Sequence, residues 1–184
     1  MKLIILDRDG VINQDSDEFI KSPDEFIPIQ GSLEAITKLN HAGYMVMVAT
    51  NQSGLARGLF TLDELNSMHD KLRRLLSAFG GRIDGILLCP HGPDDNCNCR
   101  KPKPGMLQEI AQRCDMSLEG VPAVGDSLRD LQAAIAVGAK PVLVKTGKGM
   151  RTLDAISKMS DQPELASISV YDNHSHYVDS VLEQ

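Results

Sequence analysis

Short runs of apolar residues alternate along the chain with longer segments in which apolar residues recur every three or four positions. The apolar runs predict strands buried on both faces, at residues 3–6, 44–50, 85–89, 122–125 and 141–145. The amphipathic segments between them predict helices at residues 32–41, 61–79, 104–114 and 128–137. This alternation indicates an α/β fold of the Rossmann-like, doubly wound class, in which helices cover both faces of a parallel sheet.

Residues that favour helix ends support these boundaries. Thr61 and Glu64 have the spacing of a capping box, and Pro104 suits a first helical turn. Beyond residue 146 the pattern weakens. It predicts a helix at residues 151–159, a short strand at residues 167–171 and a second helix at residues 172–182. No repeat or linker divides the sequence, so we expect residues 1–184 to form one domain without a large cap domain.

Composition and charge narrow the classes of function. Of the 184 residues, 42% are hydrophobic and 24% are charged, which excludes a disordered or fibrous chain. The net charge of −6 argues against a broad basic face for nucleic acid. The longest apolar stretch, at residues 44–49, is far shorter than the roughly 20 residues that span a bilayer. The apolar run before Asp7 is too short for a secretory signal, so we expect a cytoplasmic monomer without membrane or nucleic-acid partners.

Polar clusters follow four of the predicted strands, at residues 7–10, 50–54, 89–99 and 125–130. The carboxyl ends of parallel strands meet at one edge of the sheet, and ligands bind there in open α/β folds. We therefore expect these clusters to lie close together and to form the functional site.

Asp7 and Asp9 lie two residues apart, so their carboxylates can point the same way. Two such acids repel each other, a divalent cation relieves the repulsion, and oxygen ligands favour Mg²⁺. Asp126 and Asp130 supply further oxygen atoms. An isolated Asp-x-Asp-Gly is more often a surface turn. Here the motif follows a buried strand and coincides with three other clusters, which favours a metal site.

A phosphoryl group needs hydrogen-bond donors and positive charge as well as a metal. Thr50 and Asn51 offer a hydroxyl and an amide, and Arg100, Lys101 and Lys103 form a local cluster of cations. A cluster of this kind is more often a solvated surface. Its position directly after a cysteine-rich segment, at residues 89–99, favours a role in binding.

Three cysteines and a histidine gather in one short segment, at Cys89, His91, Cys97 and Cys99. This is the ligand set of a closed tetrahedral Zn²⁺ site, so we expect a structural zinc that fixes the cations directly downstream. The alternative, cysteines that fill the core, is disfavoured because the residues between His91 and Cys97 are polar. Cys114 lies in the apolar rhythm of a helix and is predicted to pack in the core.

The remaining histidines carry weaker signals. His41 and His69 are predicted on helix surfaces, and His174 and His176 in a solvated C-terminal segment. Arg57 leaves two interpretations open, a substrate contact and a structural salt bridge. None of these residues is predicted to be catalytic.

Four motifs resemble, in order and spacing, those of haloacid dehalogenase-like (HAD-like) phosphatases. They are Asp-Arg-Asp-Gly-Val-Ile-Asn at residues 7–13, Thr-Asn-Gln-Ser-Gly-Leu-Ala-Arg-Gly at residues 50–58, Arg-Lys-Pro-Lys-Pro-Gly at residues 100–105 and Gly-Asp-Ser-Leu-Arg-Asp at residues 125–130. The resemblance covers about residues 1–150. With the cysteine-rich segment, the motifs are similar to the branch of D-glycero-D-manno-heptose bisphosphate phosphatases and histidinol-phosphatases.

The resemblance implies a mechanism. Asp7 would attack phosphorus and form an aspartyl-phosphate. Asp9 would act first as acid and then as base, and would ligate Mg²⁺ through its backbone carbonyl. Asp126 would complete the protein ligands, and Asp130 would hold metal-bound water or orient the ligands.

Substrate contacts are implied as well. Thr50 and Lys101 would bind phosphoryl oxygens, and Arg100 would recognise the rest of the substrate. Loops at residues 15–28 and 53–60, together with the loop that carries the expected zinc ligands at residues 89–99, would cover the site. The expected substrate-binding residues are Asp15, Glu18, Thr50, Asn51, Gln52, Ser53, Arg100 and Lys101.

The implied activity is a Mg²⁺-dependent phosphatase that removes the 7-phosphate of a heptose 1,7-bisphosphate, a small phosphorylated sugar, in lipopolysaccharide-core precursor synthesis. The nearest alternative is a histidinol-phosphate phosphatase, although residues 26–31 and 53–61 look more similar to the heptose enzymes. A non-catalytic, zinc-stabilised interaction module and a nucleic-acid 3′-phosphatase are less favoured. Two departures from the family pattern are Val11, in place of a threonine, and Ser127, in place of a lysine.

Overall fold

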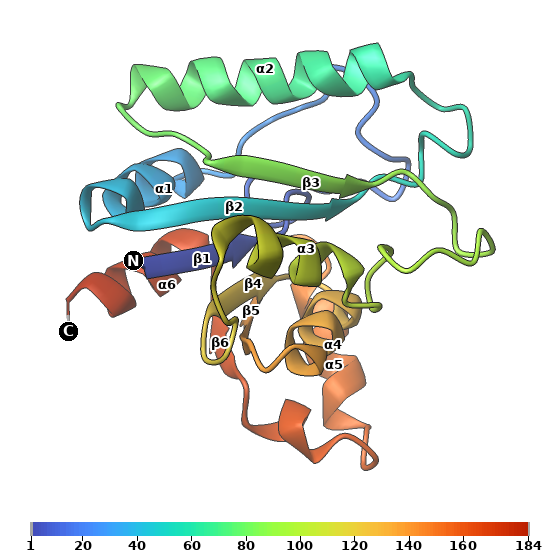
Figure 1. Cartoon of the computed structure of the whole chain (residues 1–184), viewed down its shortest axis with the longest axis vertical. Coiled ribbons are helices and arrows are strands. Elements are labelled where there is room, and N and C mark those ends of the chain that lie inside the picture. Colours follow the sequence, from blue (N-terminus) through green and yellow to red (C-terminus); the bar gives the residue numbers. More distant parts are fainter. Residues whose placement is uncertain (1, 184) are drawn as a thin grey trace.

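The computed structural model describes residues 2–183 and contains a six-stranded sheet in which every strand is parallel to its neighbours (Figure 1). The strands are β1 (Lys2–Leu6), β2 (Tyr44–Asn51), β3 (Gly85–Cys89), β4 (Pro122–Gly125), β5 (Lys140–Val144) and β6 (Ser169–Tyr171). Their order across the sheet is β3-β2-β1-β4-β5-β6. The predicted Rossmann-like, doubly wound sheet is confirmed.

Helices occupy most of the connections. They are α1 (Ser32–His41), α2 (Leu62–Ala78), α3 (Gly105–Cys114), α4 (Leu128–Ala136), α5 (Gly149–Ser157) and α6 (His174–Leu182), with a short 3₁₀ helix, η1 (Pro163–Ser167), before β6. None of the helices within residues 2–183 has the length and apolar character needed to cross a membrane.

The side chains of β1 alternate between two apolar layers. Ile4 and Leu6 pack with residues of α1, α2 and α6 on one face of the sheet, and Leu3 and Ile5 pack with residues of α3 and α4 on the other. Figure 1 shows the arrangement of these helices around the sheet. Ile156 of α5 packs beside α4 and β5 and extends the second layer. Helices therefore cover both faces, as predicted.

The strand order reverses at β1, which pairs with β2 on one side and β4 on the other. Connections leave these neighbours in opposite directions, so a crevice opens outside their carboxyl ends. Asp7 follows β1 and Asp126 follows β4, which places both acids in this crevice. Within the described residues, no inserted cap domain covers it.

All predicted helices and strands are present, with ends shifted by a residue or two. The capping box is confirmed, because Thr61 Oγ1 accepts a hydrogen bond from the Glu64 backbone and Glu64 Oε2 accepts one from the Thr61 backbone. Pro104 caps α3 rather than occupying its first turn.

Two predicted histidine positions are wrong. His69 is 3% exposed and lies on the buried face of α2. It follows Leu65 by four positions and precedes Leu72 by three, so the three side chains lie on the same face of the helix. His174 is 1% exposed because α6 packs against α1 instead of extending into solvent. Both histidines therefore belong to the interior of the protein.

Candidate active site

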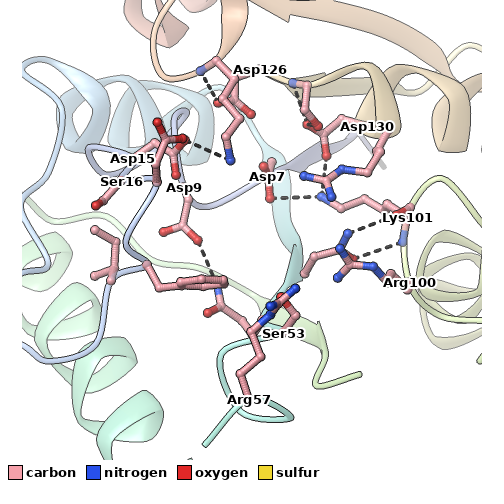
Figure 2. Close-up of a pocket in the computed structure, with 18 residues that line it drawn as sticks. Asp7, Asp9, Asp15, Ser16, Ser53, Arg57, Arg100, Lys101, Asp126 and Asp130 are labelled. Carbon is pink, nitrogen blue, oxygen red and sulfur yellow. Dashed lines mark hydrogen bonds and ion pairs between the residues drawn. The ribbon is translucent and has the colours of Figure 1, made fainter. Parts of the chain in front are cut away.

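The carboxyl ends of the central strands surround a polar cavity of about 250 Å³ (Figure 2). Three of the four predicted clusters contribute side chains to it, and the cysteine-rich segment reaches it through the residues that follow Cys99. Residues 15–17, 19 and 20, together with Arg57 and Lys148, complete the wall. The lining residues are Asp7, Asp9, Asp15, Ser16, Asp17, Phe19, Ile20, Asn51, Gln52, Ser53, Arg57, Arg100, Lys101, Asp126, Ser127, Arg129, Asp130 and Lys148.

A buried lysine joins two carboxylates in this cavity. The Nζ atom of Lys101 lies 3.0 Å from Oδ1 of Asp7 and 2.6 Å from Oδ1 of Asp130 (Figure 2). It also donates to the Ala49 carbonyl at 2.7 Å. Asn51 holds the lysine backbone, accepting from its N–H at 3.0 Å and donating to its carbonyl at 3.1 Å. The segment after β3 is thereby attached to the end of β2.

The charges of these three groups are coupled. Burial opposes the charge of Lys101, but the carboxylates of Asp130 and Asp7 raise its pKa, so the ammonium stays protonated. Burial also opposes ionisation of Asp130, yet Lys101 holds the pKa of that carboxyl below its usual range. Burial and the charge of Asp130 raise the pKa of Asp7 to about 7. The site carries more carboxylates than one lysine neutralises.

Asp126 occupies a narrow cradle. Its Oδ2 atom accepts a hydrogen bond from the Lys148 backbone at 2.7 Å. Gly10 and Gly147 have positive φ values of 84° and 56°, and a Cβ on either residue would overlap Oδ2 of Asp126. Burial and the charge of Asp130 raise the pKa of Asp126 to about 8.

The donor set fits Mg²⁺. Carboxylate oxygens of Asp7, Asp126 and Asp130 lie within 4.8 Å of one another, and all-oxygen sites are those that Mg²⁺ prefers. The raised pKa values of Asp7 and Asp126 reflect negative charge that a cation would offset. Among the described residues, the Asp9 carboxylate does not join this group, and the use of its backbone carbonyl stays a prediction.

Asp9 is held by four hydrogen bonds. Its Oδ1 atom accepts from Nε and Nη2 of Arg8 at 3.1 and 2.7 Å and from Asn13 at 2.8 Å. Its Oδ2 atom accepts from Gln52 at 3.0 Å (Figure 2). Burial opposes ionisation, but Arg8 and these hydrogen bonds lower the pKa of Asp9 below its usual range. The carboxylate is therefore ionised in the free protein.

Two predicted substrate contacts do not reach the cavity. Thr50 is 1% exposed, lies outside the cavity lining, and its Oγ1 atom accepts a hydrogen bond from Gln52 at 2.9 Å. Glu18 is exposed and also lies outside the lining. The neighbouring Asp15 and Asp17 line the cavity instead.

The loop at residues 15–20 is attached to the segment around α5. Lys148 lies 3.3 Å from Asp15, and Arg151 lies 2.9 Å from Asp17. Sequence reasoning missed Lys148 as a site residue, because only the folded chain brings the region after β5 to the edge of the cavity. The signal available was its place in a long segment without acids.

Three arginines line the cavity and have no carboxylate within ion-pair distance among residues 2–183: Arg57, Arg100 and Arg129. Burial, together with the charges of Arg129 and Arg57, lowers the pKa of Arg100. Arg57 also stacks on Phe19, with its Cζ atom 5.6 Å from the ring centroid, rather than making the salt bridge considered from the sequence. Arg129 was not predicted, although it lies inside the last motif.

The two departures from the family pattern have structural roles. Val11 is fully buried and packs in the apolar layer that contains Leu6. Ser127 caps α4, and its N–H and hydroxyl donate to Oδ2 of Asp130 at 2.9 and 2.6 Å. The cap leaves Oδ1 of Asp130 for Lys101.

The four predicted zinc ligands converge. His91 Nδ1 lies 3.6 Å from Cys89 Sγ and 3.3 Å from Cys99 Sγ, and Cys89 Sγ lies 3.7 Å from Cys97 Sγ. Ligand atoms of a tetrahedral zinc site are about 3.7 Å apart at Zn–S distances near 2.3 Å. The donor set therefore fits zinc. Cys114 lies apart, half-buried against Met45.

The chain matches two protein families: polynucleotide kinase 3 phosphatase over residues 2–128 and HAD-hydrolase-like over residues 98–173. The D-glycero-beta-D-manno-heptose-1,7-bisphosphate 7-phosphatase of Bordetella bronchiseptica is 64% identical over 153 residues, which are 83% of this chain and 86% of that protein. The protein of the same name from Yersinia pestis is 40% identical over 154 residues, with 79% and 81% covered.

Solved structures agree with these relatives. The crystal structure of D,D-heptose 1,7-bisphosphate phosphatase from B. bronchiseptica, complexed with magnesium and phosphate, matches with a TM-score of 0.93 and 55% identity over 100% of this chain and 99% of that chain. The crystal structure of the D,D-heptose 1,7-bisphosphate phosphatase from Burkholderia thailandensis matches with a TM-score of 0.76 and 43% sequence identity, and the match covers both chains fully. The resemblance found in the motifs is confirmed, and the chain, a phosphoric monoester hydrolase, belongs to the D-glycero-β-D-manno-heptose-1,7-bisphosphate 7-phosphatase family of HAD-like hydrolases.

Proposed function

We propose that this chain hydrolyses the 7-phosphate of D-glycero-β-D-manno-heptose 1,7-bisphosphate, with Mg²⁺ as cofactor, in the synthesis of heptose precursors for lipopolysaccharide. The names of the 64% and 40% identical relatives support both the substrate and its β anomer. The magnesium and phosphate in the matched crystal structure support the cofactor and the phosphoryl site.

The observation that carries the proposal is the wall of three arginines, Arg57, Arg100 and Arg129, in the same cavity as Asp7. A bisphosphate has a second anion for these cations to bind. Histidinol phosphate carries an ammonium group beyond its phosphate, which the same cations would repel. The charge of the wall therefore favours the heptose bisphosphate over the alternative substrate.

Asp7 is the nucleophile of the proposed reaction. One of its oxygens attacks phosphorus, and the bond from phosphorus to the sugar oxygen breaks, which leaves an aspartyl-phosphate. Lys101 stays protonated beside Asp7 and stabilises the negative charge on the phosphoryl oxygens. Mg²⁺, held by Asp7, Asp126 and the backbone carbonyl of Asp9, would supply further stabilisation of that charge.

Asp9 moves the protons. It donates one to the sugar oxygen as that oxygen leaves, and then accepts one from the water that hydrolyses the aspartyl-phosphate. Its pKa is low in the free protein, but a bound phosphoryl group adds negative charge beside the carboxylate and raises the pKa toward the value that an acid needs. Gln52 keeps Oδ2 of Asp9 in place during both steps.

A structural Zn²⁺ at Cys89, His91, Cys97 and Cys99 completes the proposal. The four ligands leave no open position for a substrate. Arg100 follows the last ligand directly and donates to the His91 carbonyl at 3.3 Å. The zinc would thus hold the loop that aims Arg100 at the cavity.

Phosphate release tests the proposal on five compounds: the β and α anomers of the heptose bisphosphate, fructose 1,6-bisphosphate, histidinol phosphate and a heptose 7-phosphate. We expect the β bisphosphate to have the highest kcat/KM, by about tenfold or more, because only it offers the second phosphate in the preferred configuration. Asp7→Asn should reduce release by about a thousandfold or more while the fold and the zinc remain. A preference for histidinol phosphate would contradict the proposed substrate.

A further inference from the structure

Arg8 is fully buried and lies in the sequence between the two candidate catalytic residues, Asp7 and Asp9. The proposed reaction steps use none of its atoms. One edge of its guanidinium, Nε and Nη2, donates to Oδ1 of Asp9. Its Cζ atom lies 5.5 Å from the centroid of the Phe26 ring. The remaining nitrogen, Nη1, lies 3.3 Å from Nε2 of His69.

His69 comes from α2, a helix that contributes no residue to the cavity lining. A guanidinium only donates hydrogen bonds, so Nε2 of His69 must be the acceptor and the ring proton must lie on Nδ1. Burial and the charge of Arg8 lower the pKa of His69 to about 4, which keeps the ring neutral. The contact therefore has a defined direction, from Arg8 to His69.

The two oxygens of Asp9 differ as a result. Oδ1 accepts three hydrogen bonds, two from Arg8 and one from Asn13. Within the described part of the chain, Oδ2 accepts a single one, from Gln52. Because Oδ1 is saturated, Oδ2 is the oxygen left to exchange a proton with the substrate.

We infer that His69 is a positioning residue for the proton transfer by Asp9. By accepting from Nη1 it fixes the plane of the Arg8 guanidinium, and the opposite edge of that plane fixes the carboxylate with Oδ2 free for the substrate. The inference rests on the proposed acid and base role of Asp9. The proton passes from Asp9 to the sugar oxygen as the bond to phosphorus breaks, and His69 exchanges no proton in this step.

The test compares kcat/KM for two phosphate esters in the unmodified protein, His69→Leu and His69→Gln. This ratio includes steps up to departure of the leaving group, so hydrolysis of the aspartyl-phosphate does not enter it. A sugar oxygen needs a proton to leave, whereas p-nitrophenolate leaves without one. General acid catalysis contributes about 10²–10⁴-fold, so a misplaced acid should cost His69→Leu about tenfold or more on heptose bisphosphate and less than about threefold on p-nitrophenyl phosphate.

His69→Gln keeps a hydrogen-bond acceptor and should recover most of the loss. His41→Leu, which removes an exposed histidine from α1, should leave both values unchanged. Equal losses on the two esters, or a Gln variant as impaired as the Leu variant, would overturn the inference, because a general packing defect has those effects.

Two further measurements distinguish a failure of this inference from a failure of the proposed function. If the unmodified protein does not hydrolyse heptose bisphosphate, the proposed function fails, and the same comparison on the alkyl phosphate that it hydrolyses fastest decides the role of His69. If His69→Leu does not fold, the imidazole ¹⁵N shifts of the unmodified protein decide it: an unprotonated Nε2 supports the inference and a protonated Nε2 overturns it.

Discussion

The side-chain nitrogen of Lys101 lies 3.0 Å from Oδ1 of Asp7, although the two residues are 94 positions apart in the chain. The lysine is 4% exposed, and its side chain lines the cavity and reaches Asp7 at the end of β1. A buried ammonium in this position requires carboxylates around it, and the carboxylates in turn require the ammonium. Catalysis and stability are therefore coupled at this contact.

Replacement of Lys101 by Met should damage both properties. Removing a fixed charge from beside the reacting phosphoryl group should lower kcat/KM by about 10²–10³-fold. It also leaves Asp7 and Asp130 buried without their cation, which should lower the free energy of unfolding by about 3 kcal/mol. Phosphate release and urea unfolding measure the two effects. Lys140→Met, at an exposed lysine of β5, is the control and should change neither.

A second prediction concerns the cradle around Asp126. Gly10 and Gly43 have nearly equal φ values of 84° and 83°, but a Cβ at Gly10 would overlap Asp126, whereas a Cβ at Gly43 would meet no atom of residues 2–183 within 4 Å. Gly43→Ala should therefore cost only the left-handed backbone energy, about 1 kcal/mol of unfolding free energy. Gly10→Ala should cost more and should also weaken Mg²⁺ binding by about tenfold or more, because it displaces Asp126. Calorimetric titration with Mg²⁺ that gives equal affinities for the two variants would contradict this account of the cradle.

The zinc site makes a third prediction. The purified protein should retain about one zinc ion per chain through a mild EDTA treatment that removes Mg²⁺, because closed cysteine-rich sites bind zinc tightly. Cys97→Ser should lose this metal, whereas Cys114→Ser, outside the cluster, should keep it. Elemental analysis of the three proteins provides the measurement. A zinc-free preparation with its fold and full activity would refute a structural zinc.

The sequence was sufficient to predict the parts of the site that depend on topology. Asp7 and Asp126 each follow a short apolar strand, and parallel strands necessarily bring their carboxyl ends to one edge of the sheet. The spacing of the three cysteines and His91 similarly predicted that their side chains would converge, and the structure brings the four together. In both cases a local pattern was enough to predict which side chains meet, while the zinc itself stays a prediction.

Residues that join the site through tertiary packing could not be predicted in this way. His69 reaches Arg8 only because α2 packs over the loop after β1, and its place on the stripe of Leu65 and Leu72 was the one available signal. Asp17 and Glu18 are adjacent acids that the sequence does not distinguish. In the structure Asp17 lines the cavity and forms an ion pair with Arg151, which is far away in the sequence. Long-range contacts of this kind have no local pattern.

The last prediction concerns His174, whose two ring nitrogens are buried and have no hydrogen-bond partner among residues 2–183. Burial lowers its pKa from 6.5 to about 4 in the folded protein. Between these values the unfolded chain binds a proton that the folded protein does not, so stability falls as the pH falls below about 6.5 and levels off near pH 4. At pH 5 the loss from this histidine is about 2 kcal/mol relative to pH 7.5.

His174→Leu should remove that loss and flatten the dependence of unfolding free energy on pH between 7.5 and 5. His41→Leu, at an exposed histidine, should keep the dependence of the unmodified protein. Urea unfolding at several pH values compares the three proteins, and since zinc binding and the remaining groups are common to all of them, the difference in slope reports the substituted histidine. If His174→Leu and the unmodified protein lose stability in parallel, the ring must be protonated inside the folded protein or its burial must be relieved, and the absence of hydrogen-bond partners would have no energetic consequence.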